Sequence, residues 1–229
     1  MFAVATGCSA QESVDDPEAA PERATDAAPA SVSPSPSRSG PRPLTAGQLK
    51  SLLLREGDVP RADSAPVQGP VPKYDPRVLV AGPDCQEVFD ALVAHNASTS
   101  VIQDFWWKNK RWSGRTWLAS YAGTEASEQF QRLTEGLKTC KTLVGQTPEG
   151  KLNSRITVAK APAFGDEAVA FDLSMGGPDH TVLIDRHILV RVGTLTVDFS
   201  DRGAQRTPGF PLDVVVDKQL DRLTQGPRT

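Results

Sequence analysis

A proline-rich tract near the start of the chain limits what this sequence can fold into. Residues 9–43 are rich in Ala, Pro, Ser, Asp and Glu, contain no aromatic residue and include the run SVSPSPSRSGPRP. Such a segment buries too little apolar surface to offset the conformational entropy that folding costs. We therefore expect residues 9–43 to be a disordered linker and residues 44–229 to fold. About 185 residues are enough for one domain with a sizeable core.

The first eight residues, MFAVATGC, place Cys8 directly after the small residues Ala5, Thr6 and Gly7. This order resembles a bacterial lipobox, in which the cysteine receives a diacylglyceryl group and the preceding residues are removed. A signal peptide also needs a basic segment and an apolar stretch of about 7 to 15 residues, which residues 1–7 do not supply. We infer that translation starts upstream, and we expect Cys8 to anchor the protein on the extracytoplasmic face of the cell membrane. The alternative is a soluble protein with a chance cysteine near its start.

The other two cysteines, Cys85 and Cys140, form an even pair within the folded part. In an oxidising compartment such a pair predicts a disulfide bond, whereas in the cytosol both would be buried free thiols. The cysteines lack CxxC spacing and the histidines are scattered, at His95, His180 and His187. We therefore expect neither a metal nor another cofactor. The net charge of −3 offers no basic face for nucleic acid.

The spacing of apolar residues predicts four helices and six strands along residues 44–229. Thr45, Asp84 and Thr124 are expected to cap the first three helices, and Pro211 to begin the fourth. Runs rich in β-branched and aromatic residues predict strands at 99–108, 115–122, 155–160, 167–175, 181–192 and 195–199.

The last predicted strand has a regular alternation of apolar and polar residues. Leu195, Val197 and Phe199 alternate with Thr196 and Asp198. Successive side chains of a strand point to opposite faces, so we expect one face to be buried and the other to be in solvent. The order of helices and strands predicts an α+β fold, a single domain in which an antiparallel sheet of about five to six strands is flanked by helices.

Several short segments of the chain occur in a distinctive order. They are Cys85 at the start of a helix, Ser120-Tyr121 at the end of a hairpin, the helix that ends at Cys140, FGDEA at 164–168 and VRVG at 190–193. This order resembles the PknH-like extracellular sensor domain of actinobacteria over residues 44–199. The resemblance implies an extracytoplasmic domain with an antiparallel sheet, flanking helices and a cleft that binds a ligand. This sequence contains neither a kinase domain nor the second cysteine pair of the kinase-linked member.

The most concentrated group of aromatic and cationic residues is DFWWKNKRW at 104–112. Three tryptophans among three cations could stack on sugar rings or bases and hold anionic groups. In a half-buried hairpin, the alternative is that at least one tryptophan belongs to the core and that the cations form a solvated turn. From this region and the later strands we take Trp106, Trp112, Arg115 and Arg191 as candidate ligand-binding residues.

The sequence predicts no catalytic residues. Asp166 and Glu167 are adjacent carboxylates, but neighbours in a strand point to opposite faces, so we favour a turn role for Gly165-Asp166 over acid and base chemistry. There is no GxSxG, no SxxK and no Gly-rich phosphate loop.

Taken together, these features predict a non-enzymatic, lipid-anchored protein of the bacterial cell envelope. Its sensor-like domain is expected to bind a small molecule, a glycan fragment or a protein in a cleft on the sheet. The alternatives are an envelope hydrolase with an unrecognised site and a structural protein-interaction module.

Overall fold

The structure is a computed structural model, and it describes residues 41–55, 57–59, 62–64, 80–107, 113–147, 150–177, 180–204 and 212–225. The lipobox cysteine Cys8, most of the expected linker and the candidate Trp112 lie outside the described residues. The described residues all belong to a single unit of the chain. The proposed boundary between linker and domain at residue 43 stays a prediction.

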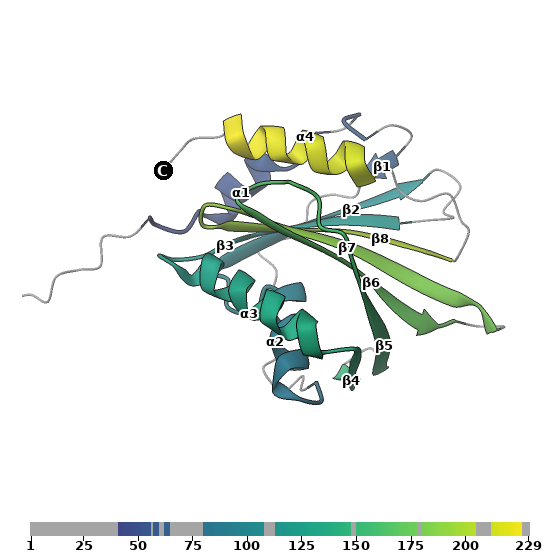
Figure 1. Cartoon of the computed structure of the whole chain (residues 1–229). Coiled ribbons are helices and arrows are strands. Elements are labelled where there is room, and N and C mark those ends of the chain that lie inside the picture. Colours follow the sequence, from purple (N-terminus) through teal and green to yellow (C-terminus); the bar gives the residue numbers. More distant parts are fainter. Residues whose placement is uncertain are drawn as a thin grey trace, which may run out of the picture. The chain divides into compact units, whose positions relative to one another are not determined.

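Four helices and eight strands are formed by the described residues (Figure 1). The helices are α1 (Ala46–Leu52), α2 (Pro83–Leu92), α3 (Glu125–Thr139) and α4 (Leu212–Gln225). The strands are β1 (Ala62–Ser64), β2 (Thr99–Trp107), β3 (Ser113–Ser120), β4 (Thr142–Thr147), β5 (Gly150–Ala159), β6 (Glu167–Gly176), β7 (Val182–Val192) and β8 (Leu195–Ala204).

All eight strands belong to one antiparallel sheet in the order β1-β2-β3-β8-β7-β6-β5-β4. The predicted α+β class is confirmed, while the sheet is larger than the five to six strands expected. The two strands absent from the prediction are β1 and β4. β1 has only three residues, and β4 is six residues long and contains a glycine, so neither produces a strong strand pattern.

Helices cover the sheet on both faces, with α1 and α4 on one side and α2 and α3 on the other (Figure 1). Toward α1 and α4, the core includes Val101, Leu118, Val197 and Phe199. The core under α2 and α3 consists of buried residues from both helices and from β4, β5, β6 and β7, among them Val88, Phe130, Leu133, Leu143, Ile156, Phe171 and Leu189.

This two-sided cover corrects the expectation for the last strand. Thr196 and Asp198 were expected to be in solvent, but both are buried. The alternation of side chains is present as predicted, with Val197 and Phe199 on the opposite face. The prediction was wrong because a second face covered by helices removes polar residues from water as well. A buried carboxylate at Asp198 then requires a partner.

The helix ends follow the expected local rules only in part, and the predicted start of the fourth helix at Pro211 lies outside the described residues. Thr45 caps α1 in a capping box with Gln48, as predicted. The cap of α2 is Gly82, and Asp84 lies in the first turn. Pro83 has a fixed φ that suits the first helical position and moves the cap to the residue before it. Thr124 is the N-cap of α3, but its hydroxyl donates to the Glu128 carboxylate instead of capping the backbone.

A disulfide bond joins Cys85 in the first turn of α2 to Cys140 at the end of α3, with 5.0 Å between the two Cα atoms. The predicted pairing is therefore present in the structure. Near the bridge, the hydroxyl of Thr139 donates to the Asp84 carboxylate over 2.6 Å. These contacts hold α2 and α3 side by side on the sheet.

Candidate functional site

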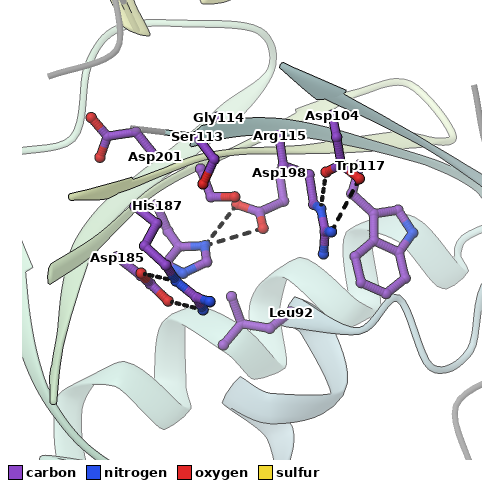
Figure 2. A pocket seen from close by; sticks show the side chains of 12 residues that line it. Leu92, Asp104, Ser113, Gly114, Arg115, Trp117, Asp185, His187, Asp198 and Asp201 are labelled. Carbon is purple, nitrogen blue, oxygen red and sulfur yellow. Dashed lines mark hydrogen bonds and ion pairs between the residues drawn. The ribbon is translucent and has the colours of Figure 1, made fainter. Parts of the chain in front are cut away.

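A polar pocket lies on the sheet face that carries α2 and α3, at the C-terminal end of α2 (Figure 2). Its volume is about 180 Å³. Most of its wall comes from β2, β3, β7 and β8, and α2 contributes one apolar side chain. The lining residues are Leu92, Asp104, Ser113, Gly114, Arg115, Trp117, Asp185, His187, Asp198, Ser200, Asp201 and Arg202.

The register of the sheet explains why charged residues meet here. Asp104 pairs with Arg115, and Arg115 pairs with Ser200 on the next strand. Ser200 in turn pairs with His187. These four residues therefore form one row across β2, β3, β8 and β7, on a single face of the sheet. The adjacent row contains Ser113, Arg202 and Asp185.

Two arginines in these rows form ion pairs with carboxylates on neighbouring strands. Arg115 donates from Nε to Asp104 Oδ1 over 2.6 Å and from Nη2 to Oδ2 over 3.3 Å. Arg202 donates from Nε and Nη2 to the Asp185 carboxylate over 2.7 and 2.6 Å. In both pairs two nitrogens face two oxygens, the geometry that fixes a guanidinium most firmly.

His187 is the most buried basic group of the pocket. Its Nδ1 lies 3.1 Å from both oxygens of Asp198, and its ring stacks on Phe171 with 5.3 Å between centroids. Burial acts to lower the pKa of His187, but the Asp198 carboxylate and, to a lesser degree, Asp185 outweigh it. The pKa of His187 is therefore raised above its ordinary value, which favours the charged form.

Ser200, His187 and Asp198 invite comparison with a hydrolytic triad. Ser200 is the register partner of His187, but no hydrogen bond joins their side chains in the described part of the chain. β8 also pairs on both sides, with β3 and β7. Its backbone N–H groups are therefore engaged around Ser200, which leaves no pair of them to stabilise an oxyanion. The arrangement suits binding better than acyl transfer.

The candidate residues from the sequence do not gather at one place. Arg115 lines the pocket. Trp106 is 42% exposed and is the register partner of the lining residue Ser113, but it does not itself line the pocket. Trp112 lies outside the described residues. Arg191 is at the opposite end of β7 from the pocket residue Asp185.

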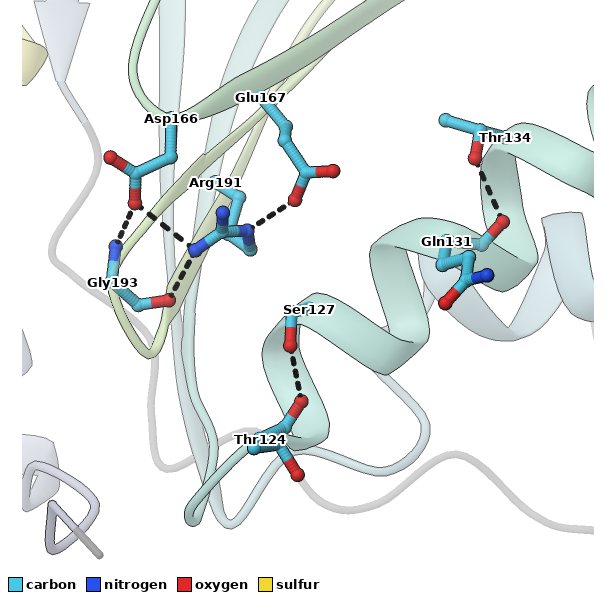
Figure 3. A network of polar contacts seen from close by, with 8 residues as sticks. All are labelled: Thr124, Ser127, Gln131, Thr134, Asp166, Glu167, Arg191 and Gly193. Carbon is cyan, nitrogen blue, oxygen red and sulfur yellow. Dashed lines mark hydrogen bonds and ion pairs between the residues drawn. The ribbon is translucent and has the colours of Figure 1, made fainter.

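Arg191 instead holds the start of β6 against the β7–β8 turn (Figure 3). It donates to the carboxylates of Asp166 and Glu167 and to the carbonyl of Gly193. The Asp166 carboxylate also accepts the backbone N–H of Gly193 over 2.7 Å. The two adjacent acids thus converge on one arginine, although neighbours within a strand were expected to point to opposite faces. They can do so because Asp166 precedes Glu167, the first residue of β6.

Sequence reasoning missed most of the pocket, namely Asp185, His187, Asp198, Ser200 and Arg202. One signal was available. Asp198, Ser200 and Arg202 recur at every second position of β8, and Asp185 and His187 do so in β7. Polar residues at a period of two mark one face of a strand. This period does not tell whether that face meets water, helices or a ligand.

Comparison with known proteins shows a similarity to a solved structure. No protein-family model and no curated protein sequence matches the chain. The crystal structure of the extracellular domain of PknH from Mycobacterium tuberculosis matches with a TM-score of 0.58 and 15% sequence identity. The match covers 80% of this chain and 98% of that domain. The chain has the fold of the PknH extracellular domain. The resemblance inferred from the order of short segments is therefore confirmed at the level of fold.

A second match is an uncharacterised protein from Mycobacterium smegmatis, with a TM-score of 0.34 and 12% identity, covering 79% of this chain and 92% of that one. This similarity is too low to support an argument about structure. Among the helices in the described ranges, none combines the length and hydropathy needed to cross a membrane.

Proposed function

We propose that the protein is an extracytoplasmic, sensor-like domain that binds a small ligand in the sheet pocket and does not transform it. The observation that carries the proposal is the pocket itself. Charged side chains from four strands are brought together there in fixed ion pairs, beyond the end of α2. Paired charges held by a rigid sheet lose little freedom when a ligand binds, which favours recognition.

Two features support an extracytoplasmic location. The fold is that of a domain described as extracellular in PknH. The Cys85–Cys140 bond suits an oxidising compartment, because cytosolic thiols are kept reduced. The lipobox-like sequence at Cys8 adds a means of attachment to the membrane, and we include a lipid anchor in the proposal. The ligand would then reach the pocket from outside the cell.

A thermal-shift screen of the full-length, disulfide-bonded protein against small molecules, glycan fragments and peptides tests ligand binding. A ligand at about 100 times its dissociation constant stabilises the native state by roughly 2.7 kcal/mol. We expect Arg115→Gln to reduce this shift, because it removes a guanidinium that lines the pocket. The matched control is Arg155→Gln. Arg155 lies on β5 next to the inward-facing Ile156, so it points to the other face of the sheet.

The control variant should respond to the ligand as the unmodified protein does. A ligand that stabilises Arg115→Gln as strongly as the unmodified protein binds outside the pocket, and this result would contradict the proposed site. Complete absence of stabilising ligands across the three classes would contradict the proposed function. Conversion of a bound ligand to a product would favour the hydrolase alternative.

A further inference from the structure

Besides the buried indole nitrogen of Trp117, the pocket contains three nitrogen atoms of arginine and histidine side chains that have no partner in the described part of the chain. Arg115 and Arg202 each use Nε and Nη2 to hold a carboxylate, so the Nη1 group of each remains available. His187 uses Nδ1 to contact Asp198, so its Nε2 remains available. The ion pairs orient the two guanidinium groups before any ligand arrives.

These three side chains surround Ser200. Arg115 and His187 are its register partners on the two flanking strands, and Arg202 follows it by two residues on β8. Directly paired residues on neighbouring strands lie about 5 Å apart and diagonal ones about 7 to 8 Å. Long side chains at such positions can reach a common point above the sheet. Figure 2 shows Arg115 and His187 on opposite sides of Asp198.

The exposure of the charged groups shows which of them a ligand meets first. The side chains of Asp104, Asp185 and Asp198 are only 8 to 14% exposed, whereas those of Arg115 and Arg202 are 45% and 62% exposed. A ligand that enters from solvent therefore encounters the guanidinium groups before the carboxylates. With His187 protonated, its charge balances Asp198. The fourth lining carboxylate, Asp201, is paired with Arg186 over 3.4 Å, so the charges at the site balance once this pair is counted. Under these conditions an anion meets donors without net repulsion.

We propose that the pocket binds an oxyanion, the carboxylate or phosphate group of a small ligand, through Nη1 of Arg115, Nη1 of Arg202 and Nε2 of protonated His187. This inference rests on the proposed function and adds to it the chemical class of the ligand. It also makes binding dependent on pH.

The pH dependence follows from the contact between His187 and Asp198. A carboxylate beside Nδ1 keeps the hydrogen on that nitrogen, so neutral His187 presents a lone pair at Nε2. Protonation adds a hydrogen to Nε2 and converts it from an acceptor into a donor. An oxyanion therefore binds the protonated form and raises the pKa of His187 further. Binding is expected to tighten as the pH falls through that pKa and to weaken above it.

The environment of His187 contains both signs of charge. The apolar neighbours are Phe171 from β6 and Leu92 from α2. The charged groups around it are Asp185 on its own strand, Asp198, Asp201 and Arg202 on β8, Arg115 on β3 and Asp104 on β2. Asp201 is itself paired with Arg186 over 3.4 Å. Because the four groups on Arg115, Asp104, Arg202 and Asp185 form two neutral pairs, Asp198 is the carboxylate left to balance His187.

An NMR titration of the full-length, disulfide-bonded protein tests the proposal. Acetate and inorganic phosphate are added separately between about pH 5.5 and pH 8, on either side of the ordinary histidine range. Acetamide serves as the uncharged control. Acetate stays predominantly ionised in this range, so a change of its affinity with pH reports on protonation of the protein. The comparison with phosphate decides which oxyanion is preferred. The imidazole signals of His95 and His180, outside the lining, provide internal references.

We expect an anion to shift the His187 signals, to raise the pKa of His187 and to bind more tightly at low pH, while acetamide has no effect. Arg115→Gln and Arg202→Gln should each weaken binding roughly 10- to 100-fold, the usual worth of one hydrogen bond to a charged group. His187→Gln should remove the pH dependence. Arg155→Gln should leave both the affinity for the anion and its pH dependence unchanged. The melting temperature and intact disulfide of each variant verify its fold.

Three results would overturn the proposal. They are the absence of binding by either anion, equal binding of acetate and acetamide, and unchanged pH dependence in His187→Gln. If a neutral ligand stabilises the protein and Arg115→Gln reduces this stabilisation, the proposed function stands and only the assignment of an oxyanion ligand is wrong. If no ligand of any class binds, both are wrong.

Discussion

At the residue scale, two of the five segments that carried the resemblance contact each other in the structure. Gly165, Asp166 and Glu167 lie at the start of β6, and Arg191 and Gly193 lie at the β7–β8 turn. The Asp166 N–H also donates to the Arg191 carbonyl over 2.8 Å. These residues recur in order because they build one contact between distant strands, and this explains why weak motifs can indicate a fold without indicating a ligand.

Gly165 is the residue on which this contact depends most. Its φ is +58°, and a Cβ atom there would lie 2.4 Å from the Arg191 carbonyl oxygen. We expect Gly165→Ala to lower the free energy of unfolding by about 2 to 4 kcal/mol, from the left-handed backbone and the overlap together. Gly193 has a φ of +59° with nothing within 4 Å, so Gly193→Ala should cost only about 1 to 2 kcal/mol. Urea unfolding of both variants measures the difference, and equal losses would contradict the role of the close approach.

At the scale of elements, the α2–α3 pair shows how a covalent bond organises one layer. Val88, Phe130 and Leu133 from the two helices pack on the sheet beside the bridge. The helices were predictable because their apolar stripes and caps are local. Their position over one half of a sheet face was not predictable. It depends on strands that are distant in the sequence and become neighbours only when the chain folds.

Removing the bridge tests its contribution. Cys85 and Cys140 are separated by 55 residues, and closing such a loop stabilises a fold by up to about 4 kcal/mol in the chain-entropy model. We expect urea unfolding of the Cys85→Ser, Cys140→Ser double variant to show a free energy of unfolding lower by up to this amount. Relative to the unmodified protein, amide exchange should become faster in α2 and α3 than in α4. Cys8→Ser is the control and should behave as the unmodified protein. An unchanged unfolding midpoint in the double variant would show that the bridge is not stabilising.

At the scale of the whole molecule, one sheet serves two purposes. One face forms a core with α1 and α4, and the other is divided between a core under α2 and α3 and the polar pocket. The sheet keeps the ion pairs rigid because each strand that lines the pocket is hydrogen-bonded to its neighbours.

The proposed lipid attachment at Cys8 can be tested. We expect a clickable fatty acid fed to the native host to label the protein expressed from its own upstream sequence, and Cys8→Ser to abolish the label. The label should accompany a shift of the protein into the membrane fraction, because each buried methylene of a lipid chain adds about 0.8 kcal/mol to membrane binding. An unlabelled protein recovered from the cytosol would contradict the anchor.

The sequence by itself determined the helices, most of the strands, the cysteine pair and the α+β class, because caps, stripes and alternation depend on residues close together in the chain. The capping box of Thr45 and Gln48 is an example. Only the tertiary structure decided the pocket. Arg115, His187 and Arg202 meet because β8 lies between β3 and β7, and this strand order, together with the end of α2 at Leu92, is set by packing over the whole sheet.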